Sequence, residues 1–448
     1  MRSIKFIDLF AGLGGIRLGF EKSFKKAGFK PECVMTSEIK PHAIKTLDYN
    51  FEHKLMVGDI FQVHTDDIPD FDFLLGGFPC QPFSAGGKRQ GFVDTRGTLF
   101  FEIERILKAK KPYGFILENV EGLVKHDLQD KNDEIGRTLQ TILNVLENEL
   151  KYKVTWKVLD SVDFGLAQSR KRIFIVGTKD KKVKLENFEH SYKVFKDVME
   201  KGLPTLNTDF VKKLLSNYKL EDLYGKSIKD KRGGANNIHS WDIEIKGPVS
   251  KEQKIILNKL FKERRKKKWA LEIGIDWMDG MTLTLDQIKT FHNSKTLKKD
   301  LDDLVKKGYL KFEHPKALIK EITPDGIKTY RKQDENLPKG YNIVTGKLSF
   351  EINKIICPND IAPTLVATDM SRLAVPDGKG LRRFTIREGL TLFGYPKNYE
   401  IPTTEAKAFD LLGNTVAVPV VEAIAEKVAS VCSKSDYIIP KSTPVCSL

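Results

Sequence analysis

The chain has 448 residues, of which 40% are hydrophobic and 30% are charged, and its formal net charge is +15. This length suits two or three compact units, and the absence of any run of about 18 apolar residues excludes a membrane-spanning helix. We expect a reducing, cytoplasmic compartment and no metal site, because no signal peptide precedes the first strand pattern and the cysteines lack disulfide or metal-ligand spacing: Cys33, Cys80, Cys357, Cys432 and Cys446.

Short apolar runs alternate with amphipathic segments over the first 180 residues. Strands are predicted at residues 4–10, 33–37, 55–57, 73–75, 115–117, 154–159 and 173–176. Helices are predicted at residues 14–26 and from residue 99 to 107. This alternation predicts an α/β fold with a doubly wound, mostly parallel sheet, in which the ligand site lies at the carboxyl ends of the strands.

A glycine-rich turn follows the first predicted strand, in Phe10-Ala-Gly-Leu-Gly-Gly15. Glycines permit a tight turn and let a ligand approach the backbone where a helix begins. Glu38 follows the second predicted strand, where a carboxylate can accept both hydroxyls of a ribose. Asp59 follows the third, within reach of an adenine amino group. Three such features at successive strand ends indicate a bound adenosine, although the turn alone could be purely structural.

Cys80 lies on the predicted loop after strand 73–75, in Gly76-Gly-Phe-Pro-Cys-Gln-Pro-Phe-Ser84. A cysteine at the carboxyl end of a strand is placed for nucleophilic chemistry. The more common fate of a lone cysteine is burial in a core. Its position beside the adenosine site favours the nucleophile.

Glu118 follows strand 115–117, where its carboxyl group could exchange a proton beside the Cys80 loop. A glutamate at a strand end is more often a cap or a surface residue. Arg170 and Arg172 precede strand 173–176, and alternation along a strand places both on one face. Two guanidinium groups on one face suit an anion or a carbonyl oxygen, or they are simply a charged strand entrance.

The basic residues are concentrated in the middle of the chain. Residues 181–350 contain 37 Lys and Arg and 24 Asp and Glu, and so carry +13 of the net charge of +15. Clustered cations attract phosphates whatever their sequence, which favours a polyanion-binding segment. Lys262-Glu-Arg-Arg-Lys-Lys-Lys268 is the densest run, and we expect it to contact phosphate. A lysine-rich solvated surface is the alternative.

Two helices are predicted within this basic segment. Thr284 and Gln287 have the spacing of a capping box for a helix to Phe291, and a second helix runs from about residue 295 to 307, where Gly308 ends it. With a strand at residues 309–312, they are compatible with a winged helix-turn-helix or with an ordinary helical pair.

The regular pattern returns after Phe384. A helix near the C-terminus has an apolar face formed by Val420, Val421, Ile424, Val428 and Val431. Residues from 433 onward are polar, and we expect them to be poorly ordered.

In their order, these segments resemble the motifs of the bacterial-type cytosine carbon-5 DNA methyltransferases. The resemblance covers about residues 4–180 and 362–432, and its later part includes Arg387-Glu388, Phe393-Gly-Tyr-Pro396 and Gly413-Asn-Thr415. It implies a Rossmann-like class I methyltransferase fold. It also implies an enzyme that transfers a methyl group from S-adenosyl-L-methionine to carbon 5 of a cytosine flipped out of duplex DNA.

The resemblance implies a role for each candidate catalytic residue. Cys80 would attack carbon 6 of the cytosine, which makes carbon 5 nucleophilic. Glu118 would hold a proton at the ring nitrogen N3. Arg170 would contact the carbonyl oxygen of the base, and Arg172 would position neighbouring groups.

The resemblance also implies two sets of binding residues. Those expected at the cofactor are Phe10, Ala11, Gly12, Leu13, Gly14, Gly15, Glu38, Ile39, Asp59, Ile60, Pro79, Leu99, Asn414 and Thr415. Phe10 would pack on adenine, and Asn414 and Thr415 would close the site. Those expected at DNA, several of them on a mobile loop at residues 84–97, are Ser84, Lys88, Arg89, Arg96, Gln168, Thr364 and Leu365.

The implied organisation places a target-recognition region inside a catalytic domain. The catalytic and cofactor-binding part is expected at residues 1–184, the target-recognition region at 185–380 with a winged helix at about 251–315, the returning chain at 381–432 and a tail at 433–448. The implied partners are duplex DNA and a restriction endonuclease that shares the site, and we expect a monomer. A tRNA cytosine methyltransferase and a DNA-binding regulator with a lapsed catalytic site remain as alternatives.

Overall fold

The computed structural model describes residues 2–78, 99–130, 132–230, 234, 236–323, 326–345 and 350–432. The chain divides into two compact units. Unit 1 consists of Met1–Glu200, Pro358–Ser371 and Phe384–Leu448, and unit 2 of Lys201–Cys357 and Arg372–Arg383. The chain therefore passes between the units more often than the expected boundaries at 184/185 and 380/381 imply.

Contacts within unit 1 explain why its borders differ from the expected ones. Val183 and Leu185 are buried in the core of the sheet. The backbone N–H of Phe195 donates to the carbonyl oxygen of Asp360 at 2.9 Å, and that of Ala362 donates to Ala167 at 2.7 Å. Residues 185–200 and 358–371 are thus held by unit 1, although we expected both segments in the inserted region.

The helices and strands of unit 1 agree with the prediction for the first 180 residues. Its strands are β1 (Arg2–Leu9), β2 (Phe29–Ser37), β3 (Met56–Val57), β4 (Phe73–Gly77), β5 (Gly114–Val120), β6 (Lys153–Asp160) and β7 (Lys171–Thr178). Its α-helices are α1 (Gly15–Lys26), α2 (Pro41–Asn50), α3 (Leu99–Lys110), α4 (Arg137–Asn144), α10 (Ile386–Leu392), α11 (Glu405–Asn414) and α12 (Val418–Cys432). Every strand predicted in this region is present.

These strands form one sheet in the order β3-β2-β1-β4-β5-β7-β6. The pairs from β3 to β5 are parallel, whereas β7 is antiparallel to both β5 and β6. Only residues 161–170 join β6 to β7, which is too short for the crossover that parallel neighbours need. The predicted α/β, doubly wound and mostly parallel sheet is therefore confirmed.

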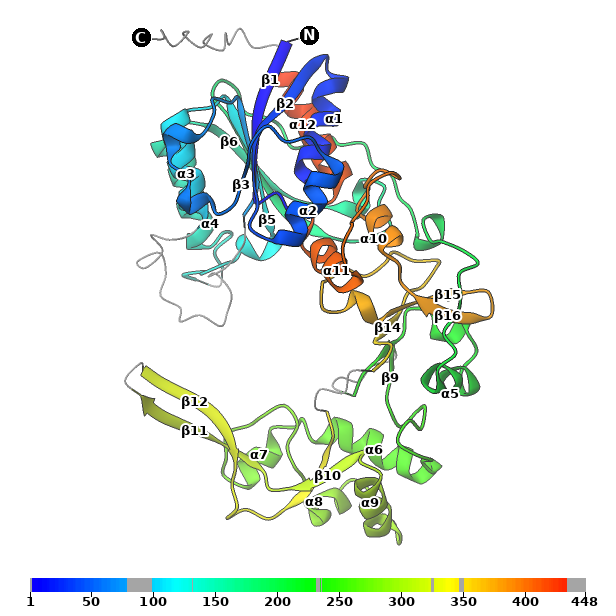
Figure 1. Ribbon diagram of the computed structural model, residues 1–448. Coiled ribbons are helices and arrows are strands. Elements are labelled where there is room, and N and C mark those ends of the chain that lie inside the picture. The colour runs from blue at the N-terminus through cyan, green and yellow to red at the C-terminus, as the bar shows by residue number, and fades with distance from the viewer. Residues whose placement is uncertain are drawn as a thin grey trace. The chain divides into compact units, whose positions relative to one another are not determined.

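Helices cover both faces of this sheet (Figure 1), with α1 and α12 on one face and α3 and α4 on the other. Phe20 and Phe24 of α1 share a core with Val421 and Val428 of α12. The helices are so close that a Cβ atom on Gly19 would lie 2.7 Å from the Cβ of Val421. The C-terminal helix thus returns to the N-terminal strand, as its apolar face predicted.

Among the described residues, Glu405–Cys432 is long and apolar enough to cross a membrane, and 67% of its apolar window is buried. This stretch consists of two helices, α11 and α12, with the break at residues 415–417. Ile424 and Ala425 of α12 are fully buried in the core of the sheet. Its apolar character is therefore explained by packing inside unit 1.

One part of unit 2 is a small sheet with a helix. Its elements are α5 (Asp209–Asn217), β8 (Ser227–Ile228), β9 (Asn237–Ile238), β14 (Lys354–Ile355), β15 (Leu373–Asp377) and β16 (Gly380–Arg383). The strands are ordered β16-β15-β14-β8-β9. Phe210 and Leu214 of α5 pack on this sheet against Ile355 and Leu381.

The other part of unit 2 is mainly helical and contains the two predicted helices. Its elements are α6 (Lys251–Glu263), α7 (Lys268–Glu272), α8 (Leu285–Lys289), α9 (Leu297–Lys306), β10 (Leu310–Glu313), β11 (Lys316–Thr323), β12 (Gly326–Gln333) and β13 (Gly340–Ile343). The capping box of Thr284 and Gln287 is present. Gly308 follows α9 with φ +80°. Both local predictions are confirmed.

Candidate functional site

The glycine-rich turn joins β1 to α1 in an unusual backbone conformation. Phe10, Gly12 and Gly14 have φ angles of 57°, 55° and 65°. These values lie in the left-handed region, which glycine adopts without cost and a phenylalanine rarely does. The Gly14 N–H donates to the carbonyl oxygen of Ala11 at 2.6 Å, which closes the turn. The strain at Phe10 marks the turn as a candidate ligand site.

Glu38 ties the end of β2 to this turn. Its carboxylate is 8% exposed, and Oε2 accepts the backbone N–H of Gly12 at 2.8 Å. Oε1 accepts the N–H groups of Ile39 and Lys40, each at 2.9 Å. A carboxylate has about four acceptor positions, so capacity remains for a further donor. Glu38 can therefore hold the turn and bind a hydroxyl group of a ligand.

The residue after Glu38 and the end of β3 present apolar and acidic side chains. Ile39 is 67% exposed, which is unusual for a large aliphatic side chain beside buried strands. Asp59 is exposed, and its Oδ1 accepts the N–H of Phe61 at 3.1 Å. Ile60 is buried in the core, so its side chain is not available to a ligand. Half-buried Phe10, exposed Ile39 and the Asp59 carboxylate suit a flat base with an amino group.

The C-terminal part of the chain meets the glycine-rich turn. The Thr415 hydroxyl is hydrogen-bonded to that of Tyr395. A Cβ atom on Gly15 would lie 2.7 Å from Tyr395 Oη and 3.3 Å from Thr415 Oγ1. The Tyr399 hydroxyl donates to the carbonyl oxygen of Leu13 at 2.6 Å. Thr415, which we expected to close the cofactor site, thus lies beside the turn together with two tyrosines that were not predicted there.

Two further residues expected at the cofactor lie at the same end of the sheet. Asn414 is exposed, and its amide donates to the carbonyl oxygen of Asp410 at 2.8 Å. Leu99 is half-buried at the first position of α3. Pro79 lies outside the described residues, as do Cys80, Ser84, Lys88, Arg89 and Arg96.

The chain leading to Cys80 is described up to Phe78. The Asn119 side-chain amide donates to the carbonyl oxygen of Phe78 at 2.9 Å. In the register of β4 and β5, Gly77 lies opposite Glu118. A Cβ atom on Gly77 would lie 3.2 Å from Glu118 Oε2, so glycine leaves room for the carboxyl group. Asn119 thus fixes the backbone of Phe78, two residues before Cys80, a role that was not predicted from the sequence.

Glu118 is a buried carboxyl group on β5. It is 9% exposed, and its Oε1 lies 3.0 Å from Nε of Arg172. Burial raises the pKa of Glu118, and the opposing charges of Arg172 and Arg170 only partly offset this. Glu118 therefore keeps its proton at higher pH than an ordinary glutamate, as a general acid requires.

Arg170 is 3% exposed and binds the backbone on two sides. Nη1 donates to the carbonyl oxygen of Leu365 at 3.1 Å, and Nη2 to that of Gly413 at 2.9 Å. Its Nε is buried without a hydrogen-bond partner among the described atoms. Burial and the neighbouring Arg172 lower the pKa of Arg170 to about 9. Arg170 thus joins three segments of unit 1 and keeps one donor free.

Three residues expected at DNA lie in the described part of unit 1, and two of them are inaccessible. Gln168 is fully buried, with its Oε1 accepting the N–H of Leu365 at 3.0 Å and its Nε2 donating to Leu392 at 3.3 Å. Leu365 is also buried. Thr364 is exposed, and its hydroxyl donates to the carbonyl oxygen of Ser169 at 2.7 Å. Gln168 and Leu365 therefore hold a segment in place, and of these three residues only Thr364 is exposed.

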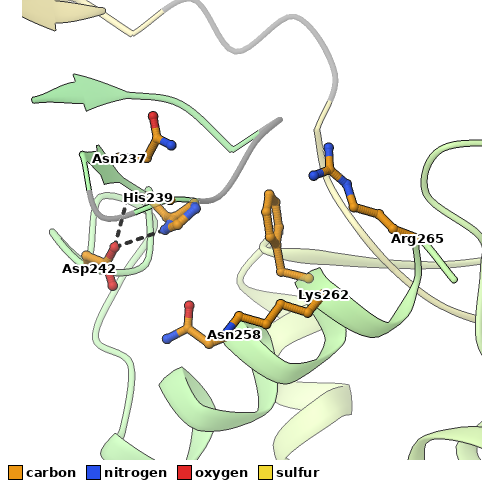
Figure 2. A pocket seen from close by; sticks show the side chains of 8 residues that line it. Asn237, His239, Asp242, Asn258, Lys262 and Arg265 are labelled. Atoms are coloured by element: carbon orange, nitrogen blue, oxygen red, sulfur yellow. Dashed lines mark hydrogen bonds and ion pairs between the residues drawn. The ribbon is translucent and has the colours of Figure 1, made fainter.

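Unit 2 contains a pocket of about 780 Å³ (Figure 2). The His239 ring stacks on Trp241 at 4.4 Å between centroids. Asp242 accepts the backbone N–H of His239 at 2.9 Å and contacts its Nδ1 at 3.2 Å. Nε2 is buried without a hydrogen-bond partner among the described atoms. The pocket offers amides, an imidazole and two cations: its lining residues are Gly234, Asn237, His239, Asp242, Asn258, Phe261, Lys262 and Arg265.

Comparison with known proteins gives a consistent result. The model of the family C-5 cytosine-specific DNA methylase matches residues 4–430. The chain is 57% identical over 427 residues to the type II methyltransferase M.NlaIV of Neisseria lactamica, covering 95% of this chain and 99% of that protein. It is 56% identical, with the same coverage, to the type II methyltransferase M.NgoBV of Neisseria gonorrhoeae. The solved structure of the Entamoeba histolytica methyltransferase EhMeth shares the fold, with 15% identity, a TM-score of 0.50 and coverage of 96% and 99%.

Proposed function

Because the chain belongs to the C-5 cytosine-specific DNA methylases, we propose that Cys80, Glu118 and Arg170 carry out its reaction at a specific sequence of duplex DNA. The enzyme transfers a methyl group from S-adenosylmethionine to carbon 5 of cytosine. The observation that carries the assignment of residues is the buried Glu118, one strand away from the fixed carbonyl group of Phe78. A proton donor is thus held beside the segment that contains the nucleophile.

The residues at the glycine-rich turn fit S-adenosylmethionine. The carboxylate of Glu38 would accept the ribose hydroxyls, and Phe10 and Ile39 would pack against adenine. Asp59 would accept the adenine amino group. The exposure of Ile39, at 67%, supports this assignment because a flat base would cover it. The bound molecule supplies the methyl group, and the chain holds it at the strand ends.

The proposed chemistry begins with the Cys80 thiolate. It forms a bond to carbon 6 of the cytosine, and the electrons of the ring double bond make carbon 5 a nucleophile. After carbon 5 takes the methyl group, a base removes its proton, the double bond re-forms and the thiolate leaves. Glu118 holds a proton at N3, so that negative charge does not build up on the ring. The raised pKa of Glu118 supports this role.

The two arginines divide the work of positioning. Arg172 lies 3.0 Å from the Glu118 carboxyl group and would set its orientation. Arg170 donates hydrogen bonds to two backbone carbonyl oxygens, and its Nε has no hydrogen-bond partner among the described atoms. We assign this remaining donor to the carbonyl oxygen of the cytosine.

The biological setting is inferred from the relatives. M.NlaIV and M.NgoBV are named type II methyltransferases, which supports a role as the modification enzyme of a restriction-modification system. We propose that the protein acts as a monomer in the cytoplasm and that an endonuclease sharing its site exists.

The pocket of unit 2 is a candidate for contacts with the recognition sequence, because its amides and cations suit bases and phosphates.

Bisulfite sequencing of plasmid DNA after expression tests this function. We expect protected cytosines confined to one sequence context. Transfer of tritiated methyl groups should be measured in parallel on duplex DNA and on tRNA. Labelling of tRNA alone would contradict the proposal and identify the protein as a tRNA cytosine methyltransferase. Absence of labelling on both, with S-adenosylmethionine still bound, would favour the regulator.

Glu38→Ala is expected to weaken S-adenosylmethionine binding by about 10- to 100-fold, because hydrogen bonds to a charged group contribute about 1.5–3 kcal/mol. Both the ribose contact and the tie to Gly12 are lost. Isothermal titration calorimetry measures the Kd. Glu32→Ala is the matched control, since Glu32 lies on β2 and pairs with Lys54 away from the turn. Equal Kd values for the two variants would contradict the assignment.

A further inference from the structure

The helical part of unit 2 has the order of elements expected of a winged helix. Helices α6 and α7 are followed by Leu283, which forms an isolated antiparallel bridge with Tyr341 of β13. Then come α8, α9 and β10, and β10 pairs antiparallel with β13. Between β10 and β13 the chain forms the hairpin of β11 and β12. The hairpin occupies the place of a wing.

This hairpin extends beyond the helices of the same unit (Figure 1). Its strands of 8 residues each span about 26 Å at about 3.3 Å per residue. Its base is anchored by Arg331, which donates to the carbonyl oxygens of Asp276 at 2.8 Å and Trp277 at 2.9 Å. None of its described residues belongs to the core of the unit. Residues 316–319 and Arg331 are half-buried, whereas residues 320–322 and 328–330 are exposed. An exposed two-stranded ribbon has little stability of its own, which points to a partner that covers it.

The charges of the hairpin point to the chemistry of that partner. Within the described residues of the two strands, four lysines and Arg331 stand against the single carboxylate of Glu321. None of these lysines, which are Lys316, Lys320, Lys328 and Lys332, forms an ion pair with a described carboxylate. Some lysines on the helices of the same unit are paired, as Lys254 is with Glu244 and Lys289 is with Asp286. Unpaired cations on a projecting ribbon are complementary to a polyanion.

An exposed aliphatic side chain lies near the tip of the hairpin. Ile322 is 87% exposed, two residues from Lys320, and is opposite Ile327 in the register. Architectural DNA-binding proteins place such side chains against the sugars and base steps of the minor groove, with cations on the flanking phosphates. A ribbon with both features fits duplex DNA better than an acidic protein surface, which offers no groove for Ile322.

We propose that the β11–β12 hairpin is a DNA-gripping arm, with Lys320, Lys328 and Lys332 on phosphates and Ile322 in the groove. The arm lies outside the region in which the sequence placed the winged helix. This inference rests on the proposed action on duplex DNA. The arm supplies affinity for DNA that does not depend on the DNA sequence, and unit 1 carries out methyl transfer.

The arm is tested by the salt dependence of binding to a mixed-sequence DNA duplex. Each phosphate contact contributes about −0.9 to the slope of log K against log salt, measured from about 50 to about 200 mM. The full-length double variant Lys320→Gln, Lys328→Gln is expected to show a slope shallower by about 0.9 for each lysine. The matched control Lys254→Gln, Lys289→Gln loses the same net charge from paired lysines and should keep the slope of the parent protein.

Ile322→Thr supplies an independent readout, because threonine keeps the β-branched shape. It is expected to weaken binding several-fold at every salt concentration without changing the slope, whereas Leu271→Ala, at another exposed aliphatic residue, should have no effect. An unchanged slope in the lysine double variant would overturn the proposal that the hairpin grips DNA. The lysines would then serve to prevent the edges of the hairpin from pairing with other strands. Methyl transfer at saturating DNA distinguishes a failure of the arm proposal from a failure of the proposed function. If the proposed function holds, the arm variants should retain methyl transfer under these conditions.

Discussion

Cys80→Ala is expected to abolish methyl transfer, with a loss of about 10⁴-fold or more, because alanine cannot form the bond to carbon 6. The two buried thiols among the described residues, Cys33 and Cys432, are poor substitutes. Burial raises the pKa of Cys33 to about 11 and that of Cys432 to about 12, so both stay protonated at neutral pH. Tritium transfer to duplex DNA measures the loss.

A trapping experiment shows whether Cys80 itself forms the bond. In DNA that carries 5-fluorocytosine, carbon 5 has a fluorine that a base cannot remove as a proton, so the enzyme should remain attached. We expect this adduct with the parent protein and with the control Cys357→Ala, whose thiol is half-buried in unit 2. It should be missing from Cys80→Ala. An adduct that persists in Cys80→Ala would identify a different nucleophile.

Glu118→Gln is expected to lower kcat by about 10²- to 10⁴-fold, the usual contribution of a positioned acid. Glutamine preserves the shape of the side chain and a hydrogen bond with Arg172, so the fold and the Kd of S-adenosylmethionine should change little. Glu121→Gln is the matched control, since Glu121 follows β5 directly and is exposed. Single-turnover kinetics on duplex DNA measures the effect on the chemical step.

The pH dependence of Glu118 has a definite sign. Burial raises its pKa, so the protonated form that serves as the acid persists above the usual range. Activity should therefore be present below this pKa and fall as the pH rises through it. The Cys80 thiolate sets the opposite limb, because it is lost as the pH falls. We expect a bell-shaped profile of activity against pH, whose alkaline limb disappears in Glu118→Gln. An unchanged alkaline limb in this variant would show that Glu118 is not the acid.

Local patterns predicted most of unit 1. Each strand is a short apolar run between turn residues, and the positive φ angles of Gly12 and Gly14 follow from glycine's freedom at a strand-to-helix turn. The capping box at Thr284 and the end of α9 at Gly308 are equally local. These features depend on neighbouring residues, so a single sequence is enough to predict them.

The β11–β12 hairpin was missed although a local signal was present. Asp325-Gly326 lies between two stretches in which polar and apolar residues alternate, a pattern typical of a hairpin turn. Gln168 was misassigned for a different reason. A polar residue beside two arginines suggests a surface, and only the burial of its amide between Leu365 and Leu392 gives it a positioning role.

The sequence by itself determined the strands, the glycine-rich turn, the basic middle segment and the set of motifs that indicate methyl transfer to cytosine. Only the tertiary structure decided how distant segments meet. The Tyr399 hydroxyl reaches Leu13, and Arg170 joins Leu365 to Gly413. The tertiary structure also decided that β7 is antiparallel to β5 and that residues 358–371 pack in unit 1. Such contacts depend on packing between residues far apart in the chain, and no local propensity encodes them.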